Sequence, residues 1–215
     1  MSLLGRTVLI TSGPTREFLD PVRYLTNASS GAMGFALAAA AKAAGAKVTV
    51  VSGPTELKPP PGIHTVKIVT ALEMRKETLR RSRGAAVIIG AAAVSDWRVA
   101  RKSSHKIKRN DSSLRLTLIP NPDIIKDAAA KRRPGQLFVG FALETRDATK
   151  SARGKLARKG LDLVVANGPA SLASGRIAAT LVAKGWSRRL PPGPKARVAK
   201  IVVAEITRLL NERRA

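Results

Sequence analysis

The residues best suited to chemistry begin with a short polar stretch, Ser29-Ser30-Gly31, which precedes an alanine-rich segment predicted to be helical from Phe35 to Ala44. Two hydroxyl groups and a glycine at a helix start leave backbone N–H groups free at the positive end of the helix dipole. This stretch is therefore expected to bind an anion such as phosphate. Asn27 stands just before it, either as a helix cap or turn residue or as a ligand contact.

A candidate carboxylate follows a run of small residues at the end of a predicted strand. Asp96 comes shortly after residues 90–92, Gly-Ala-Ala, which leave backbone groups open to a base or a ribose. Its carboxylate can hold a ribose or a metal ion, or it can simply cap a turn. Both interpretations remain open at this point.

Three lysines are candidates for neutralising phosphate charge. Lys155 and Lys159 lie four residues apart on a predicted helix, so both project from one face. Two like charges there repel one another unless an anion separates them. Lys106 lies in a Lys-Ile-Lys-Arg run, which is either a solvated charge run or a mobile segment able to swing over a phosphate site.

Several other classes of site are excluded or disfavoured. The chain has no cysteine, which excludes disulfides, thiolate catalysis and Cys-ligated metals. His64 and His105 are the only histidines, and neither has partners at metal-ligand or catalytic-triad spacing. An NAD(P)-dependent oxidoreductase is a weak alternative, because Gly31 and Gly34 lie far beyond the first strand and no acidic residue ends the second.

The elements that position these residues alternate between strand and helix. This alternation predicts an α/β, Rossmann-like open sheet, mainly parallel, with helices on both faces and ligands beyond the carboxyl ends of the strands. Strands are predicted at residues 8–10, 47–51, 65–69, 85–89, 137–141, 161–166 and 177–182, and helices at 35–44, 70–83, from 122 onward, 146–159 and 195–210.

Residues Arg98 to Leu118 break this alternation. A polar and basic run is followed by the period-two pattern of Leu114 to Leu118, which predicts a projecting loop and antiparallel hairpin that acts as a mobile flap. Its strand edges are able to pair with a second subunit, so a homodimer is expected. Residues 1–215 as a whole are predicted to form a single domain.

The composition is strongly basic, with 39 Lys and Arg against 14 Asp and Glu and a net charge of +25. Such a charge attracts polyanions, and a non-catalytic nucleic-acid-binding protein is one alternative. The basic residues are scattered, however, and few aromatic side chains are available to stack on bases, so nucleic acid is not the expected partner. The sequence shows no signal-peptide pattern and no membrane-spanning run, and a cytoplasmic protein is expected.

Seven segments, taken together, resemble the synthetase domain of bacterial phosphopantothenoylcysteine synthetases. The resemblance implies a ligase that joins 4'-phosphopantothenate to cysteine in coenzyme A biosynthesis, with CTP as co-substrate and an acyl-cytidylate as intermediate. Composition and spacing do not favour cytosine over adenine, and that choice rests on the resemblance. The segments are SGPTREFLDPVRYLTNASSG at 12–31, SGPT at 52–55, GAAAVSDW at 90–97, KIKR at 106–109, NPDI at 121–124, GFALET at 140–145 and KGLDLVVAN at 159–167.

The same resemblance implies roles for individual residues. Asn27 would act on the acyl-nucleotide intermediate, Lys106 would neutralise charge as pyrophosphate leaves, and Phe141 would form a wall for the pyrimidine ring. Mg²⁺ is expected to accompany CTP, with Asp96 as a candidate ligand. The nucleotide-binding positions are Ser29, Ser30, Gly31, Gly90, Ala91, Ala92, Asp96, Lys106, Asn121, Pro122, Asp123, Ile124, Phe141, Lys155 and Lys159.

The chain also departs from the family pattern. Ala32 stands where a basic residue is common, and Ser174-Gly175-Arg176 replaces a stretch where Asp and Asn are expected. These changes bear on phosphate affinity and on the region that holds phosphopantothenate or the second subunit. The sequence contains no flavin-dependent decarboxylase domain ahead of the synthetase motifs, which leaves open a stand-alone synthetase or one domain of a longer chain.

Overall fold

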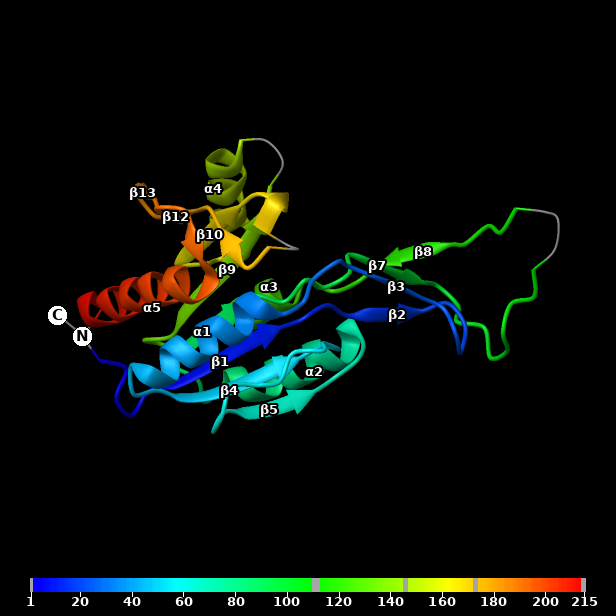
Figure 1. Cartoon of the computed structure of the whole chain (residues 1–215), viewed down its shortest axis with the longest axis horizontal. Coiled ribbons are helices and arrows are strands. Elements are labelled where there is room, and N and C mark those ends of the chain that lie inside the picture. The colour runs from blue at the N-terminus through cyan, green and yellow to red at the C-terminus, as the bar shows by residue number, and fades with distance from the viewer. Residues whose placement is uncertain (1, 110–112, 145–146, 172–173, 214–215) are drawn as a thin grey trace.

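An eight-stranded sheet forms the centre of the computed structural model, which describes residues 2–109, 113–144, 147–171 and 174–213 (Figure 1). The strand order is β13-β12-β10-β9-β6-β1-β4-β5. The six strands from β10 to β5 are parallel, whereas β12 and β13 are antiparallel to their neighbours. Their bounds are β1 Thr7–Ser12, β4 Lys47–Ser52, β5 His64–Lys67, β6 Val87–Gly90, β9 Leu137–Leu143, β10 Leu163–Asn167, β12 Ala179–Ala183 and β13 Trp186–Arg189.

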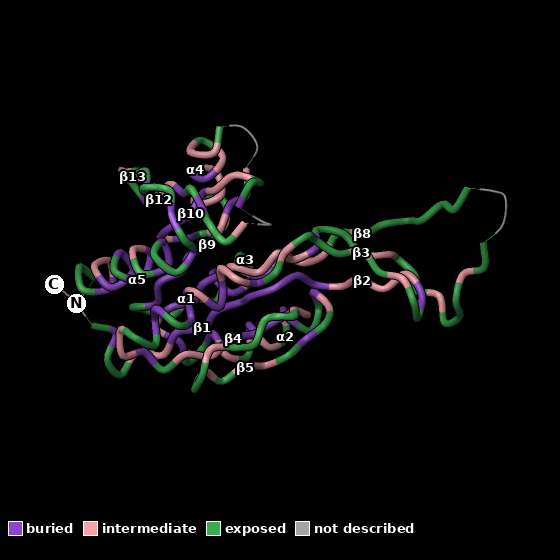
Figure 2. Tube along the Cα trace, in the orientation of Figure 1, coloured by how far each residue is buried: buried purple, intermediate pink, exposed green. Residues whose placement is uncertain are grey.

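Helices cover both faces of this sheet. Along β1, Val8 and Ile10 pack into the hydrophobic cluster on the side of α1 and α5, whereas Leu9 packs into the cluster on the opposite side with α2, α3 and α4. Figure 2 shows the buried chain concentrated between these layers. The predicted Rossmann-like architecture is therefore confirmed. The helices are α1 Ala32–Ala43, α2 Ala71–Ser82, α3 Ile124–Ala129, α4 Ala148–Lys159 and α5 Lys195–Glu212.

Most element boundaries agree with the sequence prediction to within a few residues. Helix α1 begins at Ala32 rather than Phe35, because Gly31 adopts a left-handed φ of 77° and so marks the turn into the helix. The strand predicted at 177–182 is divided into β11 Arg176–Ile177, which pairs with β14 Gly193–Pro194, and β12. The predicted start of α4 at Arg146 lies outside the described residues.

A long arm projects from the carboxyl edge of the sheet (Figure 1). We use this name for the described residues of 16–26 and 97–120. One antiparallel ladder joins β2 Arg16–Phe18 to β3 Tyr24–Thr26, and another joins β7 Trp97–Val99 to β8 Leu118–Pro120. The rings of Phe18 and Tyr24 meet edge to face at 5.4 Å between their centroids, which gives the arm a small apolar centre of its own.

The arm confirms the predicted projecting hairpin but corrects its extent. In the described part of residues 98–118, strand pairing is limited to the short β7–β8 ladder at the base of the arm. The strand predicted at Leu114 to Leu118 begins only at Leu118. Leu114, Leu116 and Leu118 are all exposed, because no second layer lies beside them to bury one face. The β2–β3 hairpin was not predicted at all.

Asp20 joins the two halves of the arm. Its buried carboxylate accepts hydrogen bonds from the backbone N–H groups of Val22, Arg23 and Ile107, at 2.8, 2.8 and 3.1 Å. Arg23 in turn donates to the carbonyl oxygen of Ile107 at 2.6 Å. Burial acts to raise the pKa of Asp20, but these N–H donors outweigh it and hold the pKa below its ordinary value.

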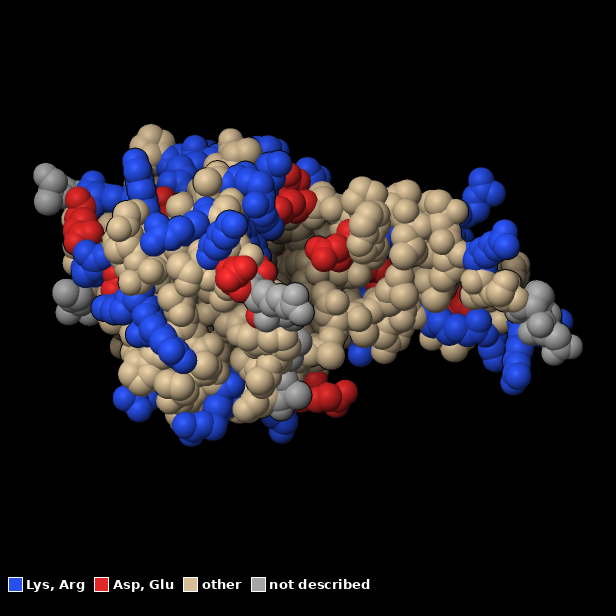
Figure 3. All heavy atoms as spheres, turned by 90° about the horizontal axis from the view of Figure 1, so that it is seen from above, with Lys and Arg blue, Asp and Glu red and all other residues tan. Residues whose placement is uncertain are grey.

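On the face drawn in Figure 3, the basic side chains do not form one continuous surface. Figure 3 shows Lys and Arg spread over the body and gathered again at the far end of the arm, with a largely uncharged stretch between them. A nucleic-acid backbone normally requires a basic stripe along one face or helix. No helix in the described part of the chain is long and apolar enough to cross a membrane.

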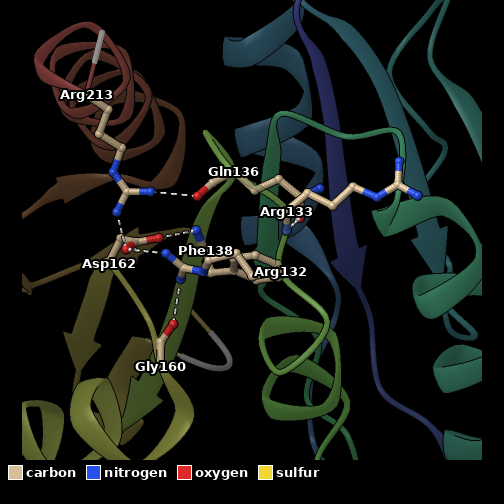
Figure 4. A network of polar contacts seen from close by, with 7 residues as sticks. All are labelled: Arg132, Arg133, Gln136, Phe138, Gly160, Asp162 and Arg213. Carbon is tan, nitrogen blue, oxygen red and sulfur yellow. Dashed lines mark hydrogen bonds and ion pairs between the residues drawn. The ribbon is translucent and has the colours of Figure 1, made fainter. Parts of the chain in front are cut away.

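Asp162 fixes the opposite end of the sheet, where α4 leads into β10 (Figure 4). One carboxylate oxygen accepts from Arg132 at 2.9 Å and pairs with Arg213, while the other accepts from the backbone N–H of Phe138 at 2.6 Å. Arg213 also donates to the carbonyl oxygen of Gln136 at 2.6 Å. One carboxylate thus ties the end of α5 to the start of β9.

Two turns of identical sequence, Ser-Gly-Pro-Thr at 12–15 and 52–55, lie side by side at the carboxyl ends of β1 and β4. The two strands are in register, with Ser12 opposite Ser52, and the N–H of Gly53 donates to the carbonyl oxygen of Ser12 at 2.9 Å. A Cβ atom on Gly53 would overlap the carbonyl oxygen of Pro14. The contact is between backbones, so neither turn has room for a side chain there.

We expect Gly53→Ala to lower the free energy of unfolding by about 1–3 kcal/mol, because the added methyl group forces the two turns apart. The matched control is Gly84→Ala, where a Cβ atom meets nothing within 4 Å and φ is not in the left-handed region. Urea denaturation of both variants measures the difference. Equal stability of the two variants would contradict the close packing of the turns.

Candidate functional site

A cavity of about 730 Å³ opens at the carboxyl edge of the parallel strands, at the base of the arm. Figure 3 shows the surface hollowed where the arm meets the body. Every residue proposed from the sequence as a ligand contact lines this cavity, with the exception of Lys106. The proposed residues that line the cavity are Asn27, Ser29, Ser30, Gly31, Gly90, Ala91, Ala92, Asp96, Asn121, Pro122, Asp123, Ile124, Phe141, Lys155 and Lys159.

The start of α1 forms one wall of the cavity. The hydroxyl of Ser29 accepts from the N–H of Gly31 at 3.3 Å, and that of Ser30 accepts from the N–H of Ala32 at 3.4 Å. Ser12 donates to the carbonyl oxygen of Gly31 at 3.0 Å and so holds the turn against β1. The N-cap residue of the helix, Gly31, has no side chain, so apart from the N–H of Ala32 the N–H groups at the start of the first turn are available for an anion.

Asn27 is held by its amide nitrogen. Nδ2 donates to the carbonyl oxygens of Ala93 and Val94, at 3.2 and 3.0 Å, across the cavity from the start of α1. The N-cap of α1 is Gly31, so the interpretation of Asn27 as a helix cap is wrong, and its carbonyl oxygen accepts from the N–H of Ser29 as in a turn. With Nδ2 engaged, Oδ1 is the side-chain atom left to meet a ligand.

The segment after β6 forms the floor. Its small residues leave space, but their N–H groups are not open as the sequence suggested. Ala91 donates to the carbonyl oxygen of Thr11 at 3.2 Å, and Ala92 donates to the hydroxyl of the same threonine at 3.3 Å. Asp96 follows with an exposed carboxylate, and its carbonyl oxygen accepts from the N–H of Asn121 at 2.8 Å.

The two lysines of α4 are kept apart by different partners. Lys159 pairs with Asp123 at 2.6 Å, and Asp123 also caps α3 by accepting from the N–H of Lys126 at 3.2 Å. Lys155 donates to the carbonyl oxygen of Phe141. The anion required between the lysines is therefore supplied in part by Asp123 of the chain itself.

Lys155 lies in an environment that alters its titration. Burial lowers the pKa of its ammonium group below the ordinary value, and the charge of Lys159 lowers it further. The carboxylates of Glu144, Asp123 and Asp96 act in the opposite direction. A bound anion near Lys155 would likewise favour its charged form.

Lys106 does not lie with the other candidates. It is exposed on the arm, next to Ile107, whose backbone is bound to Asp20 and Arg23. Residues 110–112, which follow the same basic run, lie outside the described part of the chain. The structure thus brings together the helix-start, strand-end and α4 residues, but leaves Lys106 outside their cavity.

Some lining residues were missed from the sequence. Asn167 ends β10, and the rule that ligands lie beyond strand ends would have found it; its Nδ2 donates to the hydroxyl of Ser171. Trp97 also lines the cavity and is 51% exposed. Lys195, at the start of α5, is one of 39 Lys and Arg residues, and no local pattern marks it.

The residues present allow only a limited role for a protein-bound metal. The described residues contain no group of three or more His, Asp or Glu side chains placed to hold an ion. Asp123 is engaged by Lys159, which leaves Asp96 as the carboxylate on the cavity wall with no ion-pair partner in the described part of the chain. Such a site fits Mg²⁺ that is held mainly by ligand phosphates and completed by one carboxylate.

Proteins named for coenzyme A biosynthesis are similar in sequence to most of this chain. The coenzyme A biosynthesis bifunctional protein CoaBC of Vibrio cholerae is 47% identical over 167 residues, which are 77% of this chain and 42% of that protein. The protein of the same name from Haemophilus influenzae is 39% identical over 210 residues, 95% of this chain and 52% of that protein. The chain thus spans about half the length of these curated relatives.

Solved structures agree with the sequence relatives. The crystal structure of the C-terminal domain of CoaBC has a TM-score of 0.84 at 34% identity and covers 97% of each chain. The DNA/pantothenate metabolism flavoprotein from Streptococcus pneumoniae has a TM-score of 0.84 at 25% identity, over 95% of this chain and all of that one. A Cab2 mutant in complex with phosphopantothenate-cysteine shares the fold, with a TM-score of 0.80 at 20% identity over 97% of this chain and 87% of that one.

The family described as the DNA/pantothenate metabolism flavoprotein C-terminal domain matches residues 3–210. This match covers nearly the whole chain, including the sheet, the arm and every element around the cavity. This chain therefore belongs to the DNA/pantothenate metabolism flavoprotein C-terminal domain family.

Proposed function

We propose that this chain is a ligase domain that joins 4'-phosphopantothenate to cysteine, with CTP as co-substrate. The observation that carries the proposal is the single cavity lined by all but one of the candidate residues, in a chain whose relatives are coenzyme A biosynthesis proteins. Neither alternative, an NAD(P)-dependent oxidoreductase or a nucleic-acid-binding protein, is favoured. The chain lacks the dinucleotide fingerprint, and the face drawn in Figure 3 shows no single basic stripe.

In the first half-reaction, a carboxylate oxygen of phosphopantothenate attacks the α-phosphorus of CTP, and the bond to the β-phosphate oxygen breaks to release pyrophosphate. The open start of α1 is suited to bind phosphate oxygens, because its N–H groups and dipole favour negative charge. Lys155 supplies a partly buried positive charge on the facing wall. Mg²⁺, when bound with the triphosphate, would neutralise part of its charge.

In the second half-reaction, the cysteine amine attacks the acyl carbon of the acyl-cytidylate. The carbon–oxygen bond to the phosphate breaks, CMP leaves, and the nitrogen loses a proton as the amide forms. Oδ1 of Asn27 is suited to accept a hydrogen bond from the attacking amine, since Nδ2 is fixed by Ala93 and Val94. Asn27 would thus orient the nucleophile.

A homodimer remains part of the proposal, and the arm supports it. Exposed apolar side chains run along the arm, among them Val22, 57% exposed, and Leu114, 56% exposed. Apolar surface of this kind is commonly covered by another subunit. Lys106 would have to reach a cavity either by movement of the arm or from the arm of a second subunit. A cytoplasmic location stays a prediction.

The proposed reaction predicts that pyrophosphate release requires CTP and phosphopantothenate, and that phosphopantothenoylcysteine forms only after cysteine is added. Chromatography of the products with each substrate omitted in turn provides the measurement. Equal turnover with ATP would overturn the assignment of CTP. Absence of turnover with every nucleoside triphosphate would overturn the ligase itself.

We expect Asn27→Asp to slow amide formation about a hundredfold, because the carboxylate cannot donate to Ala93 and Val94 and loses its fixed position. Pyrophosphate release should be less affected. Asn27 is exposed, so the melting temperature should stay close to that of the unaltered protein. The control is Asn211→Asp, an exposed position on α5 away from the cavity. Unimpaired amide formation in Asn27→Asp would return this residue to a purely structural role.

Mixing two inactive variants tests how Lys106 reaches the site. If the arm of one subunit serves the cavity of the other, Asn27→Asp and Lys106→Ala chains that exchange subunits form one intact site in each mixed dimer. We expect activity to be restored, because Lys106 lies outside the cavity of its own chain. Co-purification of differently tagged chains confirms exchange, and mixed dimers that remain inactive would show that Lys106 acts within its own chain or not at all.

A further inference from the structure

The start of α5 holds a buried lysine that the steps above do not use. Lys195 is only 8% exposed, and its side chain lines the cavity. Its backbone N–H donates to the carbonyl oxygen of Gly175 at 3.0 Å, but none of the described residues accepts a hydrogen bond from its ammonium group or pairs with it. Burial lowers the pKa of Lys195 below its ordinary value.

Most of the Lys195 side chain is buried, but its ammonium nitrogen is not among the fully enclosed polar atoms of the described residues and keeps some contact with solvent. A positive charge at a cavity wall with no partner among the described residues is available to an anionic ligand. Ile177, whose strand pairs with Gly193 two residues before Lys195, is a buried apolar residue. Packing alone would favour an apolar side chain at this position.

A second observation points in the same direction. Helix α5 starts at the same edge of the sheet as α1, and the two helices pack side by side (Figure 1). The N-cap residues of the two helices, Gly31 and Pro194, make no side-chain hydrogen bond to the helix starts. The first turn of α1 and Lys195, the first residue of α5, therefore both line the cavity.

The acidic residues that line the cavity interact with the lysines of α4 and not with Lys195. Asp123 is paired with Lys159, and Asp96 influences the pKa of Lys155, so both serve the wall formed by α3 and α4. Neither contributes to the pKa of Lys195, whose depression comes from burial alone. A ligand that satisfies Lys195 must bring its own negative charge.

We propose that Lys195 and the first turn of α5 form a phosphate subsite of this cavity, which holds a phosphate group of a bound substrate. The inference rests on the proposed function and adds a residue to it. Two phosphates meet the requirement: the β- and γ-phosphates of the nucleoside triphosphate, which leave as pyrophosphate, and the phosphomonoester of phosphopantothenate. In either case the bound phosphate would stabilise the charged form of Lys195.

Lys195→Met is the decisive variant, because methionine keeps the unbranched shape and removes the charge. Isothermal titration calorimetry with magnesium would compare CTP with CMP, and phosphopantothenate with pantothenate. We expect the variant to raise Kd about tenfold to a hundredfold for the phosphate-rich member of one pair, as for loss of a charge-assisted hydrogen bond, and to leave the other member unchanged. A response in the CTP and CMP pair would assign the subsite to the β- and γ-phosphates. A response in the phosphopantothenate and pantothenate pair would assign it to the phosphomonoester.

The melting temperature separates this role from a structural one. Removal of a buried, unpaired charge should leave the melting temperature of Lys195→Met unchanged or raise it. The control is Lys200→Met, an exposed lysine on the same helix, which should alter neither affinity nor stability. Equal loss for both members of each pair, no loss for any ligand, or no binding by the unaltered protein would overturn the subsite. An unaltered protein that binds CTP but forms no amide would instead overturn the proposed ligase.

Discussion

The fold depends on a backbone-to-backbone contact between the turns that end β1 and β4. Gly13 and Gly53 let these turns meet without side chains, and the N–H of Gly53 binds the carbonyl oxygen of Ser12. The side chain of Ser12 then holds Gly31, which starts α1. Because the start of α1 is one wall of the cavity, the close contact of two glycine turns sets the position of the candidate anion site.

Charge in the cavity is balanced unevenly. On the wall formed by α3 and α4, Lys159 has Asp123 as its partner, and Lys155 is surrounded by carboxylates at longer range. On the wall formed by α1 and α5, Lys195 has no such partner among the described residues. A ligand with several negative groups would therefore be oriented as well as bound, since one wall attracts its charge more strongly than the other.

Sequence predicted most of the cavity because parallel strands carry their ligand contacts at one edge. Strand ends at Gly90 and Phe141 could be recognised from apolar runs, and helix starts such as Ser29 from residue type. The β2–β3 hairpin could not, because Arg16–Phe18 has no apolar alternation and its order comes from contacts of Asp20 with distant residues. Lys195 was also hidden, since burial of one lysine among 39 basic residues depends on tertiary packing.

The arm is built from two chain segments that are far apart in sequence, 16–26 and 97–120, and Asp20 of the first binds Ile107 of the second. An insertion in one segment would move Asp20 and Ile107 out of register unless the other segment lengthened by a matching amount. The sheet would be untouched by either change, because both segments leave it and return at its carboxyl edge. The length of the arm can therefore change without disturbing the sheet only if both segments change together.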